Sequence, residues 1–168
     1  MVNSLVVQAI FIYLCRQKLQ IMSRKDVEDF QIVENKQLNQ TNHFIKLKCN
    51  SVLPEMNPGQ FVNIEIPEEK DVFLRRPFSI FEVDNIENSI SLIVKKLGKG
   101  STKLTELNVG QKLNLVYPLG KGFSLPVKND KILLIGGGSG VAPMLFLAKT
   151  SGLQKNQVHL LLGARSFS

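Results

Sequence analysis

From residue 30 onward, the chain alternates apolar and polar side chains in short segments, which is the pattern of strands that bury one face. Turn-forming residues such as Pro58-Gly59 and the polar run 84–88 separate these segments. The pattern predicts six strands, at residues 30–33, 44–49, 60–66, 78–83, 89–97 and 112–117. Six short strands joined by turns predict an antiparallel barrel or a sandwich.

One short helix is expected between the fifth and sixth strands. Ser101 or Thr102 is suited to cap it, because a hydroxyl accepts a hydrogen bond from the first turn. Residues 103–107 would form its body, with Leu104 and Leu107 facing inward.

The pattern changes at Pro126. The continuous apolar runs 131–135 and 158–162 are typical of parallel strands that are buried on both faces. A glycine loop and a helix over about 142–150 lie between them, so this region predicts the start of a doubly wound α/β domain.

Three parts are therefore expected: an N-terminal extension (1–25), a β-barrel (26–125) and the first part of an α/β domain (126–168). Two strands and one helix are an incomplete version of such a domain, and we expect its uncovered apolar faces to be loose or to associate.

Composition limits the function classes. Hydrophobic residues make up 43% and charged residues 21% of the 168 positions, as in a globular protein. The net charge is +7, but residues 1–25 carry +4 of it, which leaves +3 on the body and no nucleic-acid footprint. Two cysteines, Cys15 and Cys49, form no disulfide framework and fit a reduced cytoplasmic setting; Cys49 is expected to be a small buried hydrophobe.

The apolar stretch 5–15 is too short for a membrane span, which needs roughly 20 residues. Its basic residues follow it rather than precede it, unlike a signal peptide. Met22 is an alternative start, and we expect residues 1–21 to be dispensable for folding.

Three segments carry candidate chemistry. The first is Arg76-Pro77-Phe78-Ser79. The planar, permanently charged guanidinium of Arg76 suits the diphosphate of FAD, and Ser79 is suited to lie near the edge of the flavin ring. In isolation such a short motif more often belongs to an edge strand with ordinary surface arginines.

The second segment, Gly98–Thr102, joins glycines to a helix start, which allows close approach of a phosphate to backbone N–H groups. The alternative is a plain turn with a helix cap. The third, Gly136–Pro143, is suited to a nicotinamide dinucleotide at the carboxyl end of a parallel strand. Its alternative is a glycine-rich connection without nucleotide, and no P-loop lysine pattern supports ATP or GTP.

His43 and His159 have no ligand or nucleophile partner at useful spacing, so both are expected to be structural, and no side chain is a candidate acid–base catalyst or metal ligand.

Five motifs in register resemble the ferredoxin–NADP reductase superfamily: Pro58-Gly59-Gln60-Phe61, Arg76–Ser79, Gly98–Thr102, Gly120-Lys121-Gly122-Phe123 and Gly136–Pro143. The segments 74–80, 117–123 and 162–166 look closest to one branch, the electron-transfer subunits of NAD-dependent dihydroorotate dehydrogenase in pyrimidine biosynthesis.

The resemblance implies an FAD-binding barrel, an NAD(H)-binding α/β domain and a partner catalytic subunit that carries FMN. Mapped onto this sequence, the FAD contacts would come from Arg76, Pro77, Phe78, Ser79, Ile93, Val94, Lys95, Gly100 and Ser101, and the nicotinamide nucleotide contacts from Gly137, Gly138 and Gly140.

The family also carries a [2Fe–2S] cluster, whose cysteines are absent here. Two alternatives therefore stay open beside the dehydrogenase subunit. One is another NAD(P)H–flavin reductase of the superfamily, and the other is an FAD-binding remnant without electron transfer.

Overall fold

The computed structural model describes residues 25–67, 74–153 and 155–163. The expectations for the N-terminal extension, including Cys15 and Met22, fall outside these residues except at Lys25. No helix in the described part is long and apolar enough to cross a membrane.

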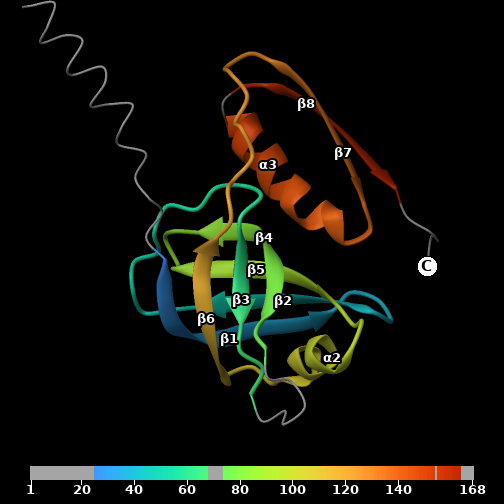
Figure 1. Cartoon of the computed structure of the whole chain (residues 1–168). Helices are drawn as coiled ribbons and strands as arrows, with labels where there is room; N and C mark the ends of the chain where they lie inside the picture. The colour runs from blue at the N-terminus through green and yellow to red at the C-terminus, as the bar shows by residue number, and fades with distance from the viewer. Residues whose placement is uncertain (1–24, 68–73, 154, 164–168) are drawn as a thin grey trace, which may run out of the picture.

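Six antiparallel strands close into a barrel in the order β1-β2-β5-β4-β3-β6, which confirms the barrel alternative over the sandwich (Figure 1). The strands are β1 (Asp26–Gln37), β2 (Asn42–Lys48), β3 (Phe61–Ile64), β4 (Arg76–Asp84), β5 (Ser89–Lys95) and β6 (Lys112–Leu119). All six predicted strands are present, although β1 is much longer and β3 shorter than the alternation indicated.

Inward-facing side chains fill the barrel. The fully buried ones include Phe30, Ile45, Ile64, Leu92 and Leu115. Cys49 belongs to the same core and is 3% exposed, as expected, and burial raises the pKa of its thiol. Core burial of this kind is the main favourable term in folding, at about 25 cal/mol per Å² of apolar surface.

A β-bulge in β1 changes which of its side chains face the core. Ile32 pairs with Leu47 and Asn35 pairs with Ile45, with a register shift between them. Residues three apart on a regular strand face opposite sides, so the bulge is what brings both Ile32 and Asn35 to the interior side.

Helix α2 (Lys99–Glu106) covers the end of the barrel at which β5 finishes. Leu104 and Leu107 are buried as predicted. The predicted cap is wrong, because the helix begins four residues before the expected body, with Gly98 as its N-cap. Ser101 instead lies in the first turn, where its hydroxyl accepts hydrogen bonds from the N–H groups of Leu97 (2.9 Å) and Gly98 (3.1 Å).

Asn35 holds the other end of α2. Its Nδ2 donates to the carbonyls of Thr105 (3.0 Å) and Leu107 (2.7 Å), which are last-turn groups without an intrahelical donor. Its Oδ1 therefore faces Nδ1 of His43, 3.0 Å away, and accepts a hydrogen bond from the N–H of that nitrogen. His43 Nε2 is buried and has no hydrogen-bond partner among the described residues.

The second unit consists of β7 (Lys131–Gly137), the 3₁₀ turn η1 (Gly138–Gly140), α3 (Val141–Leu153) and β8 (Gln157–Gly163). β7 and β8 pair in parallel, and α3 lies between this pair and the barrel, against β4 (Figure 1). Lys149 of α3 forms an ion pair with Glu82 of β4 (2.5 Å), and Phe146 packs against the barrel core. The predicted strand–glycine loop–helix–strand order is confirmed.

Burial of this unit differs from the prediction. Leu134 is 6% exposed, whereas Leu133 and Ile135 are 63% and 65% exposed. Alternate residues of a strand face opposite sides, so β7 buries one face only, and no described residue covers the other. We call Leu133, Ile135 and Leu161 the open face of the β7–β8 pair; Leu161 pairs with Ile135 and is 59% exposed.

We expect His43 to make the fold sensitive to mild acid. Burial, followed by the charge of Lys96, lowers the pKa of His43 from its ordinary 6.5. The unfolded chain thus takes up this proton first, and the free energy of unfolding should fall as pH drops below 6.5 until the folded protein also becomes protonated. Urea unfolding at pH 7.5, 6.5 and 5.5 measures this fall. The His43→Gln variant keeps a donor for Asn35 but does not titrate, and should lose less stability; equal losses in both proteins would contradict the prediction.

We also expect the open face to drive self-association. Replacing Leu133 and Ile135 with Lys should lower the apparent mass of the 168-residue chain at high concentration without changing barrel stability. Light scattering measures the mass. Val52 and Ile86, which are 85% and 95% exposed on the barrel, supply the matched control with two Lys substitutions. If the control pair lowers association equally, the open face has no special role.

Candidate functional site

An open cavity of about 520 Å³ lies between the start of β4 and the first turn of α2. It brings together segments more than 15 residues apart in sequence, because β4 and β5 are antiparallel neighbours and α2 follows β5. Six of the predicted site residues line it: Arg76, Pro77, Phe78, Lys95, Gly100 and Ser101. Three lining residues were not among the mapped contacts: Leu97, Gly98 and Lys99.

The adjacent arginines at the start of β4 have different surroundings. The Arg75 guanidinium donates to the backbone carbonyl of Asn114 (2.8 Å), to Asn114 Oδ1 (2.5 Å) and to Glu65 Oε2 (2.7 Å). These bonds hold it against the barrel wall. The half-buried Arg76 side chain has no hydrogen-bond or ion-pair partner among the described residues. Of the two, Arg76 is the cation available to a ligand in the cavity.

The first turn of α2 provides the opposite wall. Thr102 donates along the helix to the carbonyl of Gly98 (2.9 Å). The N–H groups of Gly100 and Ser101 precede this first i→i−4 bond, so helix geometry gives them no backbone acceptor within α2. Gly100 is buried in this turn, and a Cβ added at Gly98 would meet no atom within 4 Å. Helix N–H groups, open space and a guanidinium are the surroundings that a phosphate group requires.

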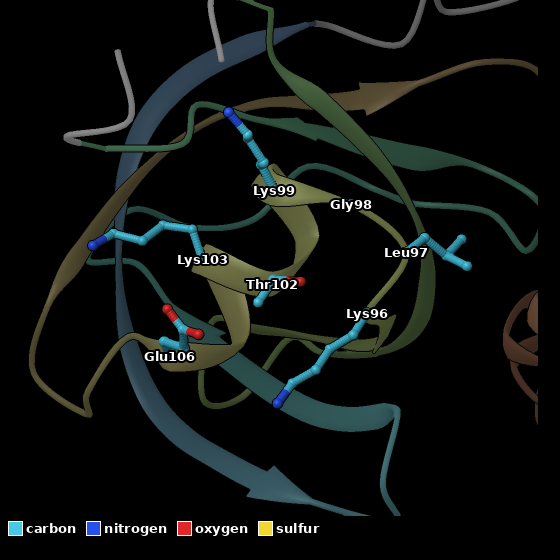
Figure 2. A pocket seen from close by; sticks show the side chains of 7 residues that line it. All are labelled: Lys96, Leu97, Gly98, Lys99, Thr102, Lys103 and Glu106. Carbon is cyan, nitrogen blue, oxygen red and sulfur yellow. The ribbon is translucent and has the colours of Figure 1, made fainter. Parts of the chain in front are cut away.

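A second hollow of about 610 Å³ adjoins the first on the outer side of α2 (Figure 2). Its lining comprises Lys96, Leu97, Gly98, Lys99, Thr102, Lys103 and Glu106. Leu97, Gly98 and Lys99 line both hollows, so an elongated anion could lie across the start of the helix.

Three predicted flavin residues lie outside the cavity lining. Ser79 pairs with Phe61 and is half-buried on the strand face opposite to Ile80, which is fully buried in the core. Ile93 is half-buried and opposes Phe44 across the β2–β5 pair. The Val94 side chain is completely buried in the barrel core, so only its backbone could touch a ligand.

Two of the glycine motifs, Pro58–Phe61 and Gly120–Phe123, contact each other. Gly120 has φ +79, and a Cβ there would lie 2.9 Å from the ring of Phe61. A side chain at position 120 would therefore be strained and would displace the ring. Gly59 is restricted in the same way, with φ +93 and a would-be Cβ 2.9 Å from the ring of Phe123, so each segment carries glycine where it meets the aromatic ring of the other.

The glycines of the second unit lie at the carboxyl ends of both parallel strands. Gly137 ends β7 and pairs with Gly163, which ends β8. Gly138 has φ +56 and, like Gly140, has open space where a side chain would stand. Gly136 instead packs closely under α3, with a would-be Cβ 3.1 Å from Met144 Cγ. The predicted Gly137, Gly138 and Gly140 thus form an exposed backbone surface at the start of α3.

The described residues include no group of three or more His, Cys, Asp or Glu side chains that could hold a metal ion. The site consists of cations, backbone N–H groups and hydroxyls, which is suited to binding and orienting a charged ligand.

Comparisons with known proteins identify the family of this chain. The family model for the oxidoreductase FAD-binding domain matches residues 29–123. The chain is 35% identical over 142 residues to the electron transfer subunit of dihydroorotate dehydrogenase B (NAD(+)) from Fusobacterium nucleatum subsp. nucleatum, covering 83% of this chain and 55% of that protein. It is 40% identical over 108 residues to the subunit of the same name from Desulforamulus reducens, covering 64% and 41%. The chain thus spans about half the length of the curated relatives it matches.

Solved structures give the same picture. The ferredoxin reductase in carbazole 1,9a-dioxygenase has a TM-score of 0.75 at 28% identity, with 84% of this chain and 43% of that chain covered. The NADH-dependent reduced ferredoxin–NADP oxidoreductase has a TM-score of 0.72 at 29% identity, with 82% and 49% covered. Phthalate dioxygenase reductase has a TM-score of 0.72 at 18% identity, covering 83% and 44%, and shares the fold.

Proposed function

Because the chain belongs to the oxidoreductase FAD-binding domain family, we propose that it binds FAD and passes electrons between NAD(H) and a dihydroorotate dehydrogenase catalytic subunit carrying FMN. In this role the chain would be an oxidoreductase component of pyrimidine biosynthesis. The names of its relatives support the assignment to this enzyme. The observation that carries FAD binding is the cavity in which Arg76, which has no hydrogen-bond or ion-pair partner in the described part of the chain, faces the first turn of α2.

The residues present fit FAD. The diphosphate would lie between the guanidinium of Arg76 and the N–H groups at the start of α2, with Lys95 as a further cation. The adjoining hollow has room for the adenosine half, and Ser79, Ile93 and the Val94 backbone would take the flavin half along β4 and β5. When bound, FAD supplies the step between two-electron hydride chemistry and single-electron transfer.

The protein's own contribution is binding and orientation. Residues 26–125 would hold FAD, and the 126–168 region would bring the nicotinamide nucleotide to the exposed backbone of Gly137, Gly138 and Gly140. The contact between α3 and β4 fixes that glycine loop relative to the strand that carries the flavin motif.

Similarity to ferredoxin reductases at 28–29% identity supports a second candidate, an NAD(P)H–flavin reductase that serves another acceptor. Both candidates require FAD, so they are separated by the partner. Co-purification with an FMN-containing dihydroorotate dehydrogenase subunit supports the first, and reduction of a ferredoxin without such a partner supports the second.

We expect Arg76→Ala to weaken FAD binding by about 1.5–3 kcal/mol, the usual scale for a charge-assisted hydrogen bond. Fluorescence titration of the apoprotein measures this as roughly a 10- to 150-fold higher Kd. Arg76→Lys keeps the charge but loses the planar guanidinium, so its Kd for FAD should lie between those of the parent protein and Arg76→Ala. Lys48→Ala removes an exposed charge at the far end of β2 and should leave the Kd unchanged. Unchanged affinity in Arg76→Ala would remove Arg76 from the site.

We further expect the 168-residue chain with bound FAD to be reduced slowly or not at all by NADH, and to hold no stoichiometric iron. Its nicotinamide contacts are confined to one glycine loop, and its two cysteines are too few for the four-cysteine ligation of a [2Fe–2S] cluster. Stopped-flow absorbance and iron analysis make the measurement, with dithionite reduction as the control that the flavin is competent. Fast reduction together with stoichiometric iron and sulfide would show the expectation to be wrong.

A further inference from the structure

Helix α2 cannot owe its position to its own stability. It has eight residues and includes Gly100, and isolated helices shorter than about 12–15 residues are marginal in water. Its placement therefore depends on its contacts with the barrel. Leu104 and Leu107 provide apolar burial, which resists withdrawal of the helix but is not directional.

Asn35 supplies the directional contact. Its two amide N–H groups donate to the carbonyl of Thr105 in the last turn (3.0 Å) and to that of the C-cap residue Leu107 (2.7 Å). Together these two bonds fix the rotation and the height of the helix against β1. The amide cannot turn over without losing these bonds, because a carbonyl only accepts. His43 Nδ1, 3.0 Å from Asn35 Oδ1, holds the amide in this orientation from β2.

The opposite end of the same helix is the wall of the cavity that contains Arg76. An eight-residue helix is about 12 Å long and moves as one body, so a shift at its last turn is carried to its first turn. Asn35 itself is not part of either cavity lining. Any effect of Asn35 on a ligand in the cavity must therefore pass through α2.

We propose that Asn35, oriented by His43, is a positioning residue for diphosphate binding, which it serves by holding the first turn of α2 opposite Arg76. The inference rests on the proposed FAD function. It adds a residue from β1, the strand that pairs with β2 and β6 and contributes nothing to the cavity lining.

Asn35→Asp is the sharpest test, since it keeps the shape of the side chain but sets a carboxylate against two carbonyls. We expect its Kd for FAD to rise at least about tenfold, equivalent to 1.4 kcal/mol. ADP, used as a competitor, should weaken by the same factor, because it keeps the diphosphate and lacks the flavin ring. Asn35→Ser retains one donor and should give a smaller loss in the same direction, and it provides the measurement if Asn35→Asp does not fold.

Tyr117→Phe is the matched control. It removes a part-buried hydrogen bond to Glu28 (2.8 Å) at the other end of the barrel. Melting temperatures are measured for all variants, and Tyr117→Phe should lower stability without raising the Kd for FAD or ADP.

The outcomes separate the two proposals. If the Asn35 variants bind FAD as the parent does while Arg76→Ala does not, the positioning role is overturned and the proposed function stands. If Tyr117→Phe weakens FAD as much as Asn35→Ser for the same loss of melting temperature, general stability explains the effect and the positioning role is also overturned. If the parent chain does not bind FAD, both proposals fall.

Discussion

Antiparallel pairing of β4 with β5 is the constraint on which the candidate site depends. It sets the start of β4 beside the end of β5, at one mouth of the barrel. Because α2 leaves β5 after only a few residues, its first turn must lie beside Arg76. A cation and a set of helix N–H groups that are more than 20 residues apart in the chain thus become neighbours through strand pairing alone. Leu104 and Leu107 of the same segment are buried at this mouth, so the packing that closes the core also places the first turn of α2 at the site.

Much of this arrangement could be predicted from the sequence. Period-two alternation located the six strands because each buries one face, and the continuous apolar runs located β7 and β8. The sequence predicts that the motifs Arg76–Ser79 and Gly98–Thr102 share a ligand. Five of their mapped residues do line one cavity, together with Lys95. Hairpin connectivity is local, and local patterns are what a sequence reveals best.

What the sequence could not reveal depends on register and on partners. The bulge in β1 turns Asn35 inward, and no residue type in 30–35 marks it. The sequence does not distinguish Arg75 from its neighbour Arg76. Only the positions of Asn114 and Glu65 in the fold show that Arg75 bonds to the barrel wall. The start of α2 was misplaced because Ser101 is a favourable capping residue in either register, and here its hydroxyl acts from inside the first turn. The sequence predicts a structural role for His43, but its contact with Asn35 is visible only in three dimensions.

The junction between the barrel and the second unit has a consequence for its behaviour in different buffers. The Lys149–Glu82 ion pair is well exposed on both sides, at 52% and 39%, and pairs of this kind contribute little and are screened within about 8 Å at physiological ionic strength. Phe146, packed against the barrel core, is indifferent to such screening, and salting-out anions strengthen its burial. The alignment of the glycine loop with the flavin strand should therefore persist from dilute buffer to concentrated salt, whereas the affinity for a doubly charged diphosphate at the other mouth should decline across that range.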